Sequence, residues 1–116
     1  MNEVFPNIFI GDEMGASCKE ILMRVGITKI INISGSINRF PSYFKYLKIN
    51  IPDSQEYQIS FQTIEKCNQF IIKALSRPGN KVLVHCHAGI SRSCTFVMAY
   101  LIIHKNYTPE KALRQI

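Results

Sequence analysis

The segment 81–96, KVLVHCHAGISRSCTF, has the residue types and the spacing of a nucleophilic site for an anionic substrate. It begins as an apolar run, is interrupted by Cys86 between two histidines, and becomes apolar again after Arg92. A thiolate is a strong nucleophile, and a guanidinium can stabilise that anion and hold two phosphoryl oxygens in its planar fork. Cys86 and Arg92 therefore predict attack by a thiolate on a bound phosphate group.

The residues between Cys86 and Arg92 are typical of a loop that binds an anion through its backbone. An apolar strand is predicted before Cys86, and a helix is predicted to begin near Ser91. This arrangement aims successive N–H groups and a helix N-terminus at one point. Gly89 lets the backbone approach the anion closely, because it has no Cβ. We expect the substrate phosphate to be bound by His87, Ala88, Gly89, Ile90, Ser91 and Arg92.

Ser93 follows Arg92 directly and completes the set of residues that could take part in chemistry. Its hydroxyl can donate a hydrogen bond to the Cys86 sulfur when the sulfur later leaves phosphorus. The helix N-terminus and Arg92 are also expected to favour the thiolate form of Cys86.

Strands and helices are predicted to alternate along the chain. We expect strands at residues 4–10, 28–33, 46–51 and 81–85. Helices are expected at 14–25, where Gly26 ends the helix, from Ser60 until Pro78 and Gly79, at 91–104, and from Thr108 onward. The apolar face of the second helix should consist of Phe61, Ile64, Cys67, Ile71 and Leu75. This pattern predicts an α/β fold in which helices flank a central, mostly parallel sheet.

The reactive segment is expected at the carboxyl edge of this sheet, where such folds bind ligands. Its phosphate-binding loop would join a central strand to a buried helix. The 116 residues and their 47% hydrophobic content suit one domain spanning residues 1–116. No apolar stretch approaches the ~18 residues of a membrane span. We therefore expect an intracellular protein that lies in the cytoplasm, with the nucleus as an open alternative.

The basic residues are concentrated in the half of the chain that contains Cys86. Residues 1–76 carry eight basic and seven acidic residues, whereas residues 77–116 carry six basic residues and one acidic residue. The net charge of +6 suits an anionic partner. Because the four cysteines are scattered and no secretory signal is visible, we do not expect disulfides.

Residues 85–93, HCHAGISRS, resemble the signature of the cysteine-dependent protein tyrosine phosphatases, in the form found in their dual-specificity branch. The segments IFIGDEMGAS, GITKIINIS, YLKINIPDSQEY and YTPEKAL resemble other parts of the same family, so the resemblance covers nearly the whole chain. It implies hydrolysis of phosphotyrosine and phosphoserine or phosphothreonine in proteins, with Asp53 as general acid and without metal or cofactor. It also implies that the domain lacks the family's final helix after Ile116.

Three alternatives stay open at this stage. The first is a zinc site made by His85, Cys86 and His87 with Cys94 or His104, although three consecutive residues of an extended segment converge poorly on one ion. The second is a phosphoprotein-binding module that has lost catalysis. The third is a phosphatase that acts on an RNA 5'-phosphate or a phosphoinositide, although nucleic acid is otherwise not expected as a partner.

Several side chains near these motifs have simpler structural interpretations. We expect His85 to be a hydrogen-bonding residue beneath the loop, and His104 to lie at an exposed helix end. Cys18 and Cys67 are predicted to be core thiols. Arg39 is predicted to be a solvated loop charge.

Overall fold

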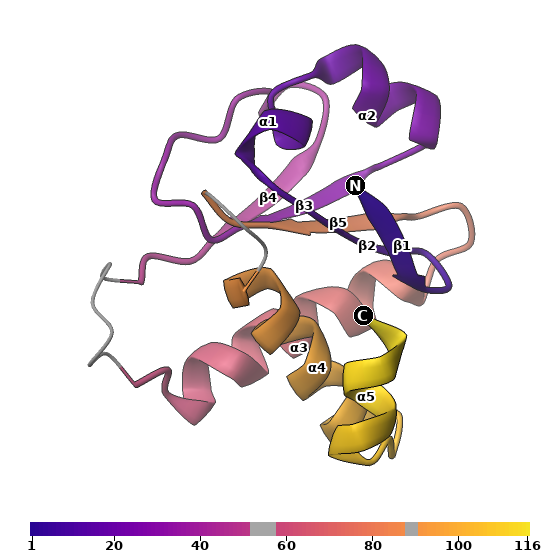
Figure 1. Ribbon diagram of the computed structural model, residues 1–116. Coiled ribbons are helices and arrows are strands. Elements are labelled where there is room, and N and C mark those ends of the chain that lie inside the picture. Colours follow the sequence, from indigo (N-terminus) through magenta and orange to yellow (C-terminus); the bar gives the residue numbers. More distant parts are fainter. Residues whose placement is uncertain (52–57, 88–90) are drawn as a thin grey trace.

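The computed structural model describes residues 1–51, 58–87 and 91–116 (Figure 1). Asp53, Ala88, Gly89 and Ile90 lie outside the described residues.

The described residues form a five-stranded sheet of order β1-β2-β5-β3-β4. Its strands are β1 (Asn2–Phe5), β2 (Ile8–Gly11), β3 (Lys29–Asn32), β4 (Lys45–Lys48) and β5 (Val82–His85). Strand β1 pairs antiparallel with β2, and the pairs β2 with β5, β5 with β3, and β3 with β4 are parallel. Strand β5 is central, and all four of its residues are buried. The predicted α/β fold class and its mostly parallel sheet are confirmed.

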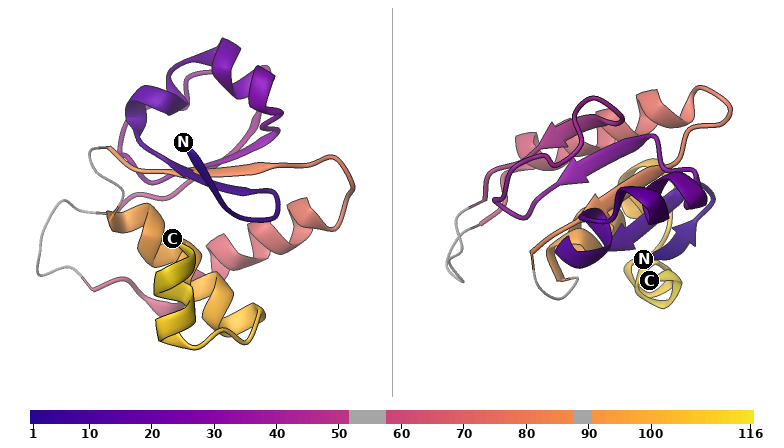
Figure 2. Two further views of the ribbon diagram at one scale, coloured as in Figure 1. Left: turned by 45° about the vertical axis from the view of Figure 1, so that its right-hand side comes forward. Right: turned by 90° about the horizontal axis from the view of Figure 1, so that it is seen from above.

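Helices cover both faces of the sheet (Figures 1 and 2). Helices α1 (Glu13–Ala16) and α2 (Lys19–Val25) lie on one face, and α3 (Phe61–Leu75), α4 (Ser91–His104) and α5 (Pro109–Gln115) lie on the other. None of the helices in the described part of the chain is long and apolar enough to cross a membrane.

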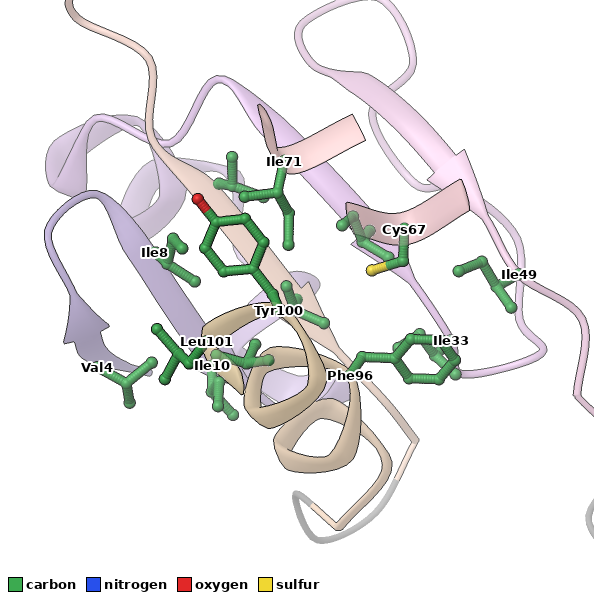
Figure 3. Packing of buried hydrophobic residues seen from close by; sticks show 14 of the residues in the cluster. Val4, Ile8, Ile10, Ile33, Ile49, Cys67, Ile71, Phe96, Tyr100 and Leu101 are labelled. Carbon is green, nitrogen blue, oxygen red and sulfur yellow. The ribbon is translucent and has the colours of Figure 1, made fainter. Parts of the chain in front are cut away.

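The larger part of the core lies between the sheet and helices α3 and α4. Phe96, Tyr100 and Leu101 reach from α4 into this layer, as Figure 3 shows, and all three are almost completely buried. A smaller cluster on the opposite face contains Leu22 of α2 and Ile30 of β3. Burial of these apolar side chains holds the end of β5 and the start of α4 in one rigid unit.

Two predicted elements are divided in the structure. The strand expected at residues 4–10 is a hairpin, because Pro6 and Asn7 form the turn between β1 and β2, and Asn7 adopts a left-handed φ of 68°. The helix expected at residues 14–25 is broken after α1. Ser17 ends α1, its hydroxyl donates to the Glu13 carbonyl over 2.6 Å, and Cys18 is extended. Short polar side chains that bond to the nearby backbone favour such breaks.

The predicted helix boundaries are confirmed where a specific cap was proposed. Gly26 ends α2 with a left-handed φ of 93°. Ser60 accepts a hydrogen bond from the Thr63 N–H, and Thr108 accepts one from the Lys111 N–H, each over 3.1 Å. One assignment was wrong, because Phe61 is 63% exposed and does not belong to the buried face of α3.

Candidate active site

Cys86 lies at the carboxyl edge of the sheet, directly after the last residue of β5. The register aligns His85 of β5 with Gly11 of β2 and Asn32 of β3, so three strands end at this level. Cys86 is only 3% exposed, and Ser93 from the first turn of α4 is fully buried. The Ser93 Oγ donates to the Cys86 Sγ over 3.1 Å, which is the hydrogen bond expected from the sequence.

Arg92 connects the start of α4 to the segment that precedes Asp53 in the sequence. Its Nη1 donates to the Ile51 carbonyl oxygen over 3.3 Å. This contact joins residues that are 41 positions apart in the sequence. Ser91 begins α4, so the positive end of a 14-residue helix dipole lies within two residues of Ser93.

His87 takes part in the described structure through its backbone. Its carbonyl oxygen accepts a hydrogen bond from the Glu13 N–H over 3.4 Å, which ties the start of the predicted phosphate loop to the start of α1. The sequence analysis predicted that His87 contacts the substrate. The backbone hydrogen bond to Glu13 does not test that prediction, which therefore stays open.

His85 is buried beneath Cys86 and is poorly suited to act as a base. Its side chain is 4% exposed, and burial lowers its pKa, although the charges of Glu13 and Asp12 partly oppose that shift. The Nδ1 atom lies 3.9 Å from Glu13 Oε2 and has no hydrogen-bond partner among the described residues. Burial therefore favours the neutral imidazole, but the hydrogen bond expected from the sequence is not found at Nδ1 among the described residues, so the structural role stays a prediction.

Glu13 links His85 to the loop between β3 and β4. Both of its carboxylate oxygens accept from the Ser36 hydroxyl over 2.9 Å, and Oε1 accepts from Arg39 Nε over 3.3 Å. Burial raises the pKa of this carboxyl, but hydrogen bonds from Ser36, Ser34 and Arg39 and the proximity of His85 outweigh it, so the pKa is lowered. Glu13 is therefore ionised at neutral pH and is not a suitable general acid.

Asn32 holds the other side of the same loop. Its side chain is fully buried, and its Nδ2 donates to the Ser36 carbonyl and to Asn38 Oδ1, each over 2.9 Å. Its Oδ1 accepts from the Ser34 N–H over 2.9 Å. Asn32 and Glu13 together hold this loop at the carboxyl edge of the sheet.

The sequence analysis did not identify Glu13 or Asn32 as residues that hold the loop between β3 and β4. It also predicted that Arg39 would be a solvated charge. A signal was present in both cases, because Asn32 is the last residue of β3 and Glu13 begins α1 two residues after the end of β2. Arg39 retains an exposed side chain at 45%, but it forms an ion pair with Glu13. The pairing spans 26 residues, so local sequence pattern could not identify it.

The remaining thiols differ from Cys86 in their surroundings. Cys67 is fully buried, and burial raises its pKa to about 12. Burial, and to a smaller extent the charge of Cys86, raises the pKa of Cys94. The prediction of a core thiol is confirmed for Cys67, whereas Cys18 is only half-buried and stands at the break before α2.

The residues of the zinc hypothesis do not form a cluster in the described structure. Among the described residues, no group of three or more His, Cys, Asp or Glu side chains could hold a metal ion. His104 instead lies near the end of α4, where its Nε2 is 3.2 Å from Glu65 Oε1 of α3.

Residues 8–116 match the family model described as the dual specificity phosphatase catalytic domain. Dual specificity protein phosphatase 26 of Rattus norvegicus is 38% identical over 99% of this chain. The chain covers 57% of that relative's length, so it spans a little over half of the curated protein.

Two solved structures have closely similar folds. The structure of DUSP15 has a TM-score of 0.87 and 32% identity, and the match covers 98% of this chain and 72% of that one. The human tyrosine phosphatase-like serine/threonine/tyrosine-interacting protein has a TM-score of 0.86 and 32% identity, over 98% of this chain and 80% of the other. The likeness therefore extends across both the sheet and the helices around Cys86.

Proposed function

The chain belongs to the dual-specificity phosphatases, and we propose that it hydrolyses phosphotyrosine and phosphoserine or phosphothreonine in proteins through a cysteinyl-phosphate intermediate. The observation that carries this proposal is the 3.1 Å hydrogen bond from Ser93 to the sulfur of Cys86 at the carboxyl edge of the sheet. A hydroxyl aimed at a buried sulfur stabilises a thiolate, which is both the nucleophile and the later leaving group.

In the first step, the Cys86 thiolate attacks phosphorus and forms an S–P bond while the ester P–O bond breaks. Arg92 holds two of the three phosphoryl oxygens in its fork, and the loop N–H groups of residues 87–92 donate hydrogen bonds to the phosphoryl oxygens as well. Asp53 donates its proton to the departing oxygen, so the dephosphorylated side chain leaves as a neutral alcohol or phenol. The contact from Arg92 to Ile51 supports this role, because Asp53 follows Ile51 by two positions.

In the second step, water attacks the cysteinyl phosphate and gives a proton to the Asp53 carboxylate. The S–P bond breaks, inorganic phosphate is released, and Ser93 donates its hydrogen bond to the departing thiolate. Metal and cofactor have no part in this scheme. The roles of Ala88, Gly89, Ile90 and Ser91 remain those proposed from the sequence, namely binding of the phosphate by backbone N–H groups.

A non-catalytic binding module is disfavoured because Cys86 and Arg92 are both present and Ser93 contacts the sulfur. A phosphoinositide or RNA substrate would benefit from fixed charge within the loop, and residues 87–90 contain no Lys or Arg. A phosphorylated protein in the cytoplasm or nucleus is therefore the proposed substrate. We also propose that residues 1–116 form a single catalytic domain.

A substrate panel tests this function. Turnover of an aryl phosphate should be unchanged by a chelator, and both phosphotyrosine and phosphothreonine peptides should be hydrolysed. Phosphothreonine has the shorter stem, so its hydrolysis requires a shallow site above Cys86. Preference for inositol phospholipids or triphosphorylated RNA over every phosphopeptide would contradict the protein substrate, and loss of rate on chelation that zinc restores would favour the metal site.

A further inference from the structure

A second concave site lies at the amino edge of the sheet, opposite the edge that carries Cys86. Its cavity has a volume of about 280 Å³, and its lining includes Lys29, Lys45, Phe70, Lys73, Arg77 and Asn80. Lys29 and Lys45 are the first residues of β3 and β4, whereas Cys86 follows the last residue of β5. Because these strands are parallel, the two sites occupy opposite ends of the strands.

The wall of this cavity is fixed by hydrogen bonds. Asn80 Nδ2 donates to the Ala74 carbonyl over 3.0 Å, and Asn80 Oδ1 accepts from the Thr28 hydroxyl over 2.9 Å. These bonds connect the last turn of α3 to the residue before β3. The cavity therefore exists before any ligand binds, which reduces the ordering that binding would require.

Four cations line one cavity, and none of them has an acidic partner among the described residues. Lys29 lies directly opposite Lys45 in the parallel pair, so the two backbones are at the strand spacing of about 4.8 Å and both side chains leave the same face of the sheet. Lys73 lies in the last turn of α3, and Arg77 follows two residues after the helix ends at Leu75. None of the lining residues is acidic, and within the described ranges none of the four cations forms a salt bridge. Such neighbouring like charges repel and destabilise the free protein.

We propose that this cavity, called the amino-edge site, binds a small molecule that carries several phosphate groups on one carbon skeleton. Four cations that converge on one cavity match clustered phosphates, whereas an extended acidic chain would be matched by a stripe of cations. Arg77 can hold phosphate oxygens in its planar fork, and the lysines supply point charges. Phe70 and Ala74 provide the apolar surface for the carbon skeleton.

Bound anion would cancel the repulsion among the four cations, so binding should stabilise the folded protein. The same chemistry is available in a soluble polyol polyphosphate and in the headgroup of a phosphorylated inositol lipid. Either source could reach the amino-edge site without entering the site of Cys86, and the test therefore includes both.

Isothermal titration with inositol trisphosphate tests the proposal in three proteins that share an unchanged Cys86 site. We expect the parent protein to show a binding event that the double variant Lys45→Gln/Lys73→Gln weakens by at least ~10-fold, because two charge-assisted contacts are lost. The matched control, Lys105→Gln/Lys111→Gln, has the same net charge and should bind like the parent. Equal weakening in both variants would show that only overall charge matters and would overturn the proposal, as would absence of this event in the parent.

Thermal unfolding and vesicle binding complete the test. The free Lys45→Gln/Lys73→Gln protein should melt no lower than the parent. If this double variant misfolds, the single variant Lys29→Gln should show the weaker binding instead.

Sedimentation with phosphatidylcholine vesicles that contain phosphatidylinositol bisphosphate tests the lipid source. Vesicle binding that depends on Lys45 and Lys73 identifies the lipid as the source, and binding of the soluble ligand alone identifies the free molecule. A hexaglutamate peptide that binds as tightly as inositol trisphosphate would contradict a polyphosphate site. None of these measurements uses turnover, so they are independent of the proposed phosphatase activity.

Discussion

The hydroxyl of Ser93 donates a hydrogen bond to the sulfur of Cys86 over 3.1 Å, in a setting where both side chains are almost completely buried. A bond of this kind gains strength when its acceptor becomes a thiolate, because hydrogen bonds to charged groups contribute about 1.5–3 kcal/mol. The sulfur is charged before attack and again after the cysteinyl phosphate is hydrolysed, so Ser93 acts on both steps of the proposed reaction.

Replacement of Ser93 by Ala should slow release of the sulfur more than its phosphorylation. We expect the steady-state rate to fall by about 10- to 100-fold, the equivalent of the hydrogen bond to the departing thiolate. Single-turnover kinetics should then show a burst followed by slow release of phosphate. Cys94→Ala, at the adjacent position, is the control and should keep the parent rate. A uniform loss without a burst would mean that Ser93 acts only on the first step.

Mild peroxide should oxidise Cys86 before it oxidises Cys67 or Cys94. Cys67 is held as a thiol by burial, which raises its pKa to about 12, and the pKa of Cys94 is also raised. If Cys86 is a thiolate in the working enzyme, peroxide should modify it first and inactivate the protein, and a thiol reductant should restore activity. Mass mapping of the oxidised residues checks this order. Modification of Cys67 or Cys94 at the same rate as Cys86 would contradict it.

The folded state should lose stability as the pH falls from 7 to 5, because His85 is buried with a lowered pKa. The unfolded chain takes up a proton near pH 6.5, the ordinary value for histidine, while the folded chain does not. Stability is therefore fully present above that pH and is lost as the pH falls through it. The slope can reach about 1.4 kcal/mol per pH unit for one proton.

Urea unfolding at pH 7, 6 and 5 measures this slope. His85→Gln should flatten it. Further loss of stability is expected below about pH 4.3, the ordinary value for glutamate, since Glu13 has a lowered pKa and its ion pair is lost as it is protonated. An unchanged slope in His85→Gln would assign the acid sensitivity to other groups.

The sequence predicted the fold well where local signals were strong. Gly26, Ser60 and Thr108 are residues with specific cap chemistry, and each ends or begins a helix as expected. The hairpin between β1 and β2 was missed because the turn at Asn7 interrupts a run of apolar residues that also suits one strand. The periodicity of α3 likewise suggested a buried Phe61, but the helix starts beyond the area covered by the core.

The candidate site was predictable only in its contiguous part. Cys86, Arg92 and Ser93 lie within eight residues, so strand, loop and helix spacing sufficed to relate them. Glu13 follows β2, whereas Asn32 and Ser36 belong to the end of β3 and the loop after it, and Glu13 meets Ser36 only because β2 and β3 both flank β5 in the sheet. Their hydrogen bonds depend on strand order, which the alternation of strands and helices does not determine.

Asp53→Asn should separate substrates by the quality of their leaving groups. The amide keeps the shape of the side chain but has no acidic proton, so alkyl and peptide phosphates should react ~10²-fold more slowly or worse, because positioned acids contribute ~10² to 10⁴. Aryl phosphates with good leaving groups should be affected much less. The fall in rate at high pH, which reports loss of the acid's proton, should disappear. Equal loss on both substrate classes with an intact bell-shaped profile would give Asp53 a structural role, and Asp12 or Glu56 would be the next acid to replace.

The most direct test of the account is to trap the covalent intermediate. Protein mixed with an aryl phosphate and quenched under denaturing conditions within one turnover should carry one phosphate, and peptide mass mapping should locate it on Cys86. Ser93→Ala should accumulate more of this adduct, because breakdown of the S–P bond is slowed. Cys86→Ser should form no such adduct and show no turnover, although it remains folded and still binds phosphate through Arg92. Phosphate on any other residue, or hydrolysis that persists in Cys86→Ser, would contradict the cysteinyl-phosphate mechanism.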